Sequence, residues 1–207
     1  MTPHVLIVLA VLTAAPPQLG EIVASELERS MAVLEEQEEP PHYIAVAVTD
    51  DWTSSVSATA GTIRHSDDDH SRYLDVDVRV GTPELDNTHP LRGASSWRAR
   101  DRSRVRFPLE DVPEHALRHA VWSEVDARYR DAVEAVVMVR ANQTVKVEEE
   151  DPAPDFEPRD AVQDRIPVEA FVFDRAAWEP VLVALSARLD ASPRVHDSSA
   201  SIRAVRQ

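Results

Sequence analysis

Apolar residues recur at helical spacing in three stretches of the chain. The first covers residues 18–37, and its apolar positions are Ile22, Val23, Leu27, Met31 and Leu34. Steps of three and four residues place side chains on one face of an α-helix, so we predict a helix there. The sequence EEQEEPP follows and ends it, because like charges repel and proline cannot continue the helical hydrogen bonds.

The second helix is predicted from about residue 112 to at least 138, with its apolar stripe running from Leu117 to Val136. Its start resembles a capping box formed by Asp111 and Glu114. Residues 138–147 suit either a longer helix or a strand. A third helix is predicted over 175–190, capped by Asp174. Its apolar face carries Trp178, Val181, Leu182, Leu185 and Leu189.

Alternating apolar and polar residues predict strands between the first two helices. HYIAVAVTDDW and SSVSATAGTIRHS read as an antiparallel hairpin that turns at DDWT, and HSDDDHS reads as the next turn. RYLDVDVRV gives the clearest strand, since every second residue from Leu74 to Val80 is apolar. SSASIRAV, near residue 207, reads as the start of one more strand.

This order of elements predicts an α+β fold in which helices pack on an antiparallel sheet of about three to four strands. We expect residues 21–207 to form a single domain. An acidic, proline-containing loop is expected at about 148–165, where charge and proline both oppose regular structure.

Residues 1–20 have the character of a secretory signal peptide. The run from Val5 to Ala15 is apolar, at about eleven residues too short to span a bilayer but within the length of a signal core. We therefore expect export to the periplasm or the extracellular space. The alternative is a buried element of a cytoplasmic protein.

Composition narrows the possible functions. A net charge of −15 disfavours nucleic acid and anionic membranes as partners. Arginines occupy every second position from Arg98 to Arg106, but only Trp97 and Phe107 flank them, so we expect an ion-paired or solvated loop. The chain has no cysteine, which excludes thiolate chemistry, and no glycine-rich phosphate loop.

His115 and His119 are the candidate metal ligands. Four residues apart on a helix, two imidazoles can share one metal ion, but zinc needs a third ligand and usually a fourth. Glu114 precedes both histidines and is expected to belong to the helix start. We therefore predict surface histidines, with weak metal binding as the alternative, and assign no catalytic or cofactor-binding residue.

Two further groups of residues have a structural and a functional interpretation. HSDDDHS, with Asp67, Asp68 and Asp69, could hold Ca²⁺ but is better read as a solvated turn. Trp97, Trp122 and Trp178 could line a ligand cleft, although core or interface packing is the preferred interpretation.

Four blocks together resemble the N-terminal portion of exported bacterial TldD/PmbA-type proteins, which are zinc metallopeptidases and their partner subunits. The blocks are SRYLDVDVRVGTPELDNTHPLRG, HALRHAVWSEVDARYRDAVEA, KVEEEDPAPDF and FDRAAWEPVLVALSARL. The resemblance spans residue 21 to the end. The family binds zinc through an HExxxH motif in a later part of a longer chain. No histidine here is followed by glutamate, so no catalytic residue is carried over and zinc is expected only outside this chain.

The resemblance implies a non-catalytic N-terminal domain, or a truncated form, of an exported zinc metallopeptidase that is inactive alone. The implied role is in homo- or heterodimer assembly with a TldD/PmbA-like subunit and in forming the cavity that admits unfolded peptide. The alternative is a free-standing exported interaction module without a peptidase role.

Overall fold

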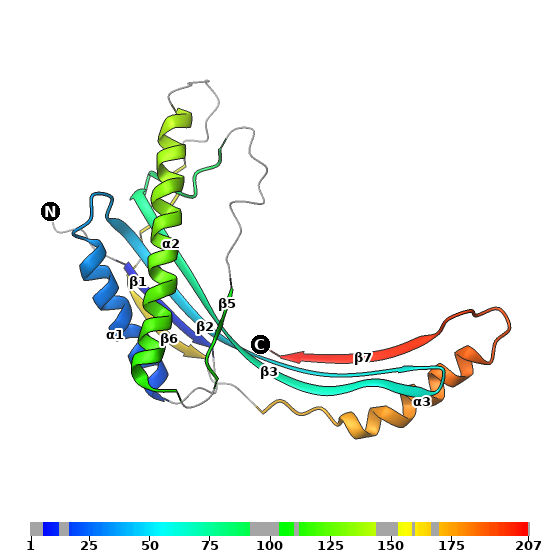
Figure 1. The fold of residues 1–207 in the computed structure, drawn as a ribbon. Coiled ribbons are helices and arrows are strands. Elements are labelled where there is room, and N and C mark those ends of the chain that lie inside the picture. Colours follow the sequence, from blue (N-terminus) through cyan, green and yellow to red (C-terminus); the bar gives the residue numbers. More distant parts are fainter. Residues whose placement is uncertain are drawn as a thin grey trace. The chain divides into compact units, whose positions relative to one another are not determined.

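The computed structural model describes residues 6–12, 17–91, 104–109, 112–143, 153–158, 160–166 and 170–206. They form an α+β fold with three helices and a mainly antiparallel sheet (Figure 1). The chain divides into two compact units. The first comprises residues 1–48 and 73–167, and the second comprises residues 49–72 and 168–207.

Two long strands form the centre of the sheet. Strand β2 (Pro41–Thr59) and strand β3 (Thr62–Thr82) are neighbours, and both contribute to each unit. Only Ala60 and Gly61 connect them, with φ values of 49° and 74°. Positive φ at both central residues is the conformation of the tight hairpin turn that fits twisted strands.

The observed hairpin shows that the turns predicted at DDWT and HSDDDHS were wrong. DDWT lies inside β2 and HSDDDHS lies inside β3, so the three predicted strands are two. Polar residues can continue these strands because they bind across them: Arg72 donates to Asp50 over 2.6 Å and Ser54 donates to Asp68 over 2.5 Å. Local alternation cannot reveal such partners, since they lie 22 and 14 residues apart.

The other strands attach to this pair. The order is β4-β3-β2-β1-β6, while β5 pairs with β3 and β7 pairs with β2. The bounds are Leu6–Leu12 for β1, Leu85–Asp86 for β4, Val105–Phe107 for β5, Val162–Ile166 for β6 and Ser199–Arg206 for β7. β7 confirms the strand predicted at SSASIRAV. β6 runs parallel to β1 and occupies the last part of the predicted acidic loop, so that part of the loop prediction was wrong.

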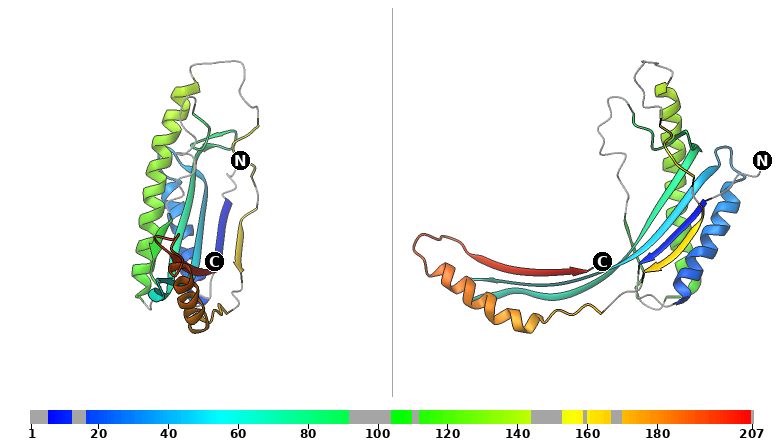
Figure 2. Two further views of the ribbon diagram at one scale, coloured as in Figure 1. Left: turned by 90° about the vertical axis from the view of Figure 1, so that its right-hand side faces the viewer. Right: turned by 180° about the vertical axis from the view of Figure 1, so that it is seen from behind.

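Helices α1 (Pro17–Leu34) and α2 (Glu114–Gln143) lie side by side on one face of the first unit's sheet (Figures 1 and 2). Both agree with the predicted helices, and α2 settles residues 138–143 as helix, while 144–147 lie outside the described residues. The predicted alternation of β3 is confirmed, since Leu74, Val76, Val78 and Val80 are all buried. They pack with the α1 and α2 stripes in one core.

The second unit has its own smaller core. Helix α3 (Arg175–Asp190) follows the predicted bounds, and the Asp174 side chain accepts a hydrogen bond from the Ala177 amide over 3.0 Å, as a helix cap should. Pro180 lies within the continuous helix. Leu182 packs on Val56, Ala58 and Ala200 of the sheet.

We predict that Gly61→Ala destabilises the second unit by about 1–2 kcal/mol, because a Cβ is strained at this positive φ. The added Cβ would also lie 3.1 Å from the Ala187 Cβ on α3. Urea unfolding measures the change. Ala60→Gly is the matched control, since glycine relieves rather than adds strain at φ 49°. Equal stability of Gly61→Ala and the unmodified chain would contradict this account.

Export remains a prediction. If residues 1–20 are cleaved as a signal peptide, strand β1 is lost with them. Its backbone pairs with β6 from Val8 opposite Val162 to Leu12 opposite Ile166. Removal of residues 1–20 would take β1 away and leave β6 without this partner. We expect the exported chain to lack these residues, as intact-mass measurement of protein recovered from the periplasm would detect. Recovery of the chain with Met1 retained would contradict the signal-peptide prediction.

Candidate functional site

Both candidate metal-binding histidines lie on exposed positions of α2. His119 stacks against Trp122 with 5.7 Å between ring centroids. Glu114 binds Arg118 one turn later over 2.8 Å. Asp111, its expected capping partner, lies outside the described residues. Across the described ranges, no group of three His, Asp or Glu side chains is placed to hold a metal ion.

The aspartates of HSDDDHS bind protein groups of the second unit. Asp68 accepts from Ser54 and lies 3.3 Å from Arg175, while Asp69 accepts from Ser71 over 2.8 Å. These contacts give two of the three carboxylates a structural role on β3. His70 belongs to the same strand and stacks on Trp52 at 4.4 Å.

The structure describes only some of the tryptophans and arginines that the sequence analysis considered. Trp97 and most of the arginine run lie outside the described residues. Arg104 stacks over the Tyr73 ring at 4.2 Å and lies 3.8 Å from Asp75, so this member of the run is ion-paired. Trp122 and Trp178 are 39% and 40% exposed on α2 and α3, which does not fit core packing for either.

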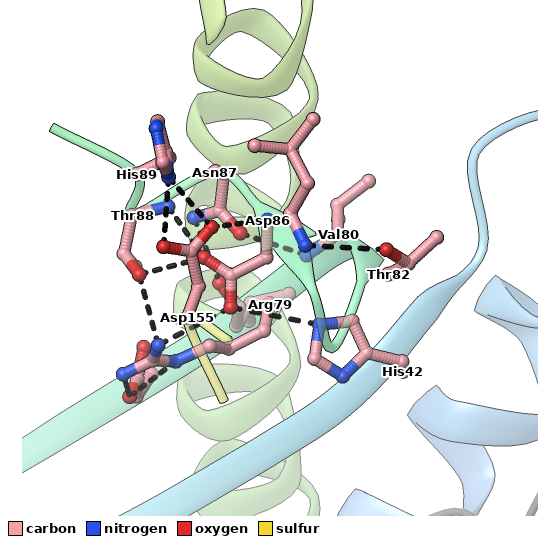
Figure 3. A network of polar contacts seen from close by, with 12 residues as sticks. His42, Arg79, Val80, Thr82, Asp86, Asn87, Thr88, His89 and Asp155 are labelled. Carbon is pink, nitrogen blue, oxygen red and sulfur yellow. Dashed lines mark hydrogen bonds and ion pairs between the residues drawn. The ribbon is translucent and has the colours of Figure 1, made fainter. Parts of the chain in front are cut away.

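A network of polar side chains lies at the end of β3 in the first unit (Figure 3). Its centre is Asp86, whose side chain is fully buried. One carboxylate oxygen accepts from both the amide and the hydroxyl of Thr88, over 2.7 and 2.6 Å. The other accepts from Arg79 over 3.2 Å. Arg79 also donates to the Thr88 hydroxyl over 2.9 Å, so the three residues form a closed cycle.

The predicted acidic loop supplies a second carboxylate to this network. Asp155 accepts from the backbone amide of Asp86 over 2.9 Å, and its other oxygen lies 2.8 Å from Nδ1 of His89. The next residue, Phe156, donates its amide to the carbonyl of Pro83 over 2.9 Å. The part of the predicted acidic loop around Asp155 and Phe156 is therefore anchored to the fold.

His42 borders the network from β2. Its Nε2 lies 3.6 Å from Asp86, beyond a normal hydrogen bond, and both buried ring nitrogens have no hydrogen-bond partner among the described residues. The Phe156 ring meets the His42 ring edge-on at 5.4 Å. The imidazole thus lies between an apolar ring and a carboxylate.

The charges around Asp86 keep it ionised. Burial by itself raises the pKa of Asp86, but the His42 ring, the Thr88 donors and the Arg79 charge outweigh burial and bring the pKa to about 2. Burial lowers the pKa of Arg79, and the charges of Asp77 and Asp86 raise it above its usual value. A carboxyl group this acidic is a poor general base near neutral pH, so Asp86 is suited to holding structure.

Gly81 allows the chain to turn into this network. Its φ is 115°, and a Cβ there would lie 2.6 Å from the Leu85 carbonyl oxygen and 3.1 Å from Val136 on α2. Only glycine fits both the conformation and this close approach. Asn87 completes the turn by accepting from the Val80 amide over 2.8 Å.

Sequence reasoning missed the network, although one local signal was available. An aspartate followed two residues later by threonine, as in Asp86-Asn87-Thr88, commonly forms a side-chain-to-backbone turn. That signal could have located the turn. It could not have found Asp155, which is 69 residues from Asp86 along the chain.

Helix α3 leaves most of its apolar face exposed. Of the five residues predicted to share that face, only Leu182 is buried. Trp178, Val181, Leu185 and Leu189 remain 39–50% exposed, and we call these four the α3 stripe. Steps of three, four and four residues align them along the helix. An aligned apolar row of this kind marks a binding surface more often than an isolated exposed residue does.

Comparison with known proteins gave no match among protein-family models, curated proteins or solved structures. Among the helices of the described residues, none combines the length and the apolar character of a membrane span.

We predict that Asp86→Asn lowers the free energy of unfolding by about 2 kcal/mol at neutral pH. The folded-state pKa of about 2 lies below the ordinary value of 3.8, so ionised Asp86 stabilises the fold above about pH 4. That contribution is lost as the pH falls through the folded-state pKa. Urea unfolding from pH 7 to pH 3 should therefore show the difference between variant and unmodified chain narrowing below about pH 4.

Asp77→Asn is the matched control for this series. Asp77 also faces Arg79, but over a longer 3.4 Å contact and with its side chain 36% exposed. We expect a smaller loss with little change across the same pH range. A difference for Asp86→Asn that stayed constant down to pH 3 would show that its charge does not provide the stabilisation.

Proposed function

We propose that this chain is a non-catalytic N-terminal domain of an exported TldD/PmbA-like zinc metallopeptidase. Its role is to assemble with a TldD/PmbA-like subunit and to help form the cavity through which unfolded peptide enters. The order of the four sequence blocks supports the family assignment. The absence of any His-Glu pair supports a role without peptide-bond hydrolysis in this chain.

The α3 stripe is the observation that carries the assembly role. Four large side chains, including a tryptophan, are aligned and exposed on one helix of the second unit. Burial of such residues against a partner contributes roughly 25 cal/mol for each Å² of apolar surface removed from water. Tryptophan is also among the residues that contribute most to protein–protein binding.

The position of the α3 stripe on the helix suits a binding interface, because other side chains of α3 already attach the helix to its own sheet. A neighbouring side of α3 is already engaged: the Ser186 hydroxyl accepts from the Gly61 amide over 3.0 Å, and Glu179 accepts from Ser66 over 2.6 Å. The helix is thus held in place by contacts that do not involve the stripe. A partner could cover the stripe without displacing α3 from its own sheet.

We predict that the double variant Val181→Glu/Leu185→Glu binds a TldD/PmbA-like subunit about tenfold or more weakly than the unmodified chain. Two carboxylates in the middle of the stripe would have to lose water on binding, which is unfavourable. Light scattering after gel filtration gives the mass of each chain alone and with the subunit. Titration calorimetry gives the affinity.

The matched control is Val137→Glu/Met138→Glu, which places the same charges on two comparably exposed apolar residues of α2. It should bind as the unmodified chain does. Equal weakening by both double variants would remove the special role of the stripe. A folded chain that does not associate with any TldD/PmbA-like subunit would favour the alternative, a free-standing interaction module.

A further inference from the structure

We draw no further inference here: the strongest candidate, the groove between α1 and α2 that Val33 and Trp122 line in the first unit, carries nothing because nothing in the described part of the structure shows what covers it.

Discussion

The two-residue turn at Ala60 and Gly61 is the constraint from which the sheet is built. It holds β2 and β3 together as one antiparallel hairpin, and every other strand attaches to one of them directly or through β1. The turn is fixed on its own unit because the Gly61 amide donates to Ser186 on α3. Both strands contain polar residues along their length, and several of these side chains have partners across the strands.

Buried carboxylates of the strands and of α1 pair with arginine. Asp50 binds Arg72, Asp86 binds Arg79, and Glu26 on α1 binds Arg29. Each acid is buried, and an unpaired charge there would be strongly unfavourable. A chain with a net charge of −15 thus places some of its few cations where carboxylates are desolvated. The remaining acids stay on the surface, where water screens their repulsion.

Two apolar surfaces of similar exposure differ in what surrounds them. The α3 stripe is an aligned row on a helix that its own sheet holds from another side, which suits a flat contact with a folded partner. A groove between α1 and α2 is hollow, and its lining combines apolar side chains with the ion pair of Asp126 and Arg130. The chain therefore offers two surfaces of distinct chemistry, one on each unit.

Local patterns determined the helices, because an apolar stripe or a capping residue such as Asp174 acts within a few residues of sequence. They also determined which residues of β3, from Leu74 to Val80, are buried. Local patterns did not reveal the hairpin, because Asp50 in DDWT and Asp68 in HSDDDHS each have a partner on the opposite strand.

The sequence alone also established that no His-Glu pair exists, and it identified the five residues of the α3 face. Only the tertiary structure decided that Leu182 is covered and its four neighbours are not, because burial depends on what packs against a face. For the same reason, the sequence did not reveal the Asp86–Asp155 contact or the groove beside Ser30. Each of them joins segments that lie far apart along the chain.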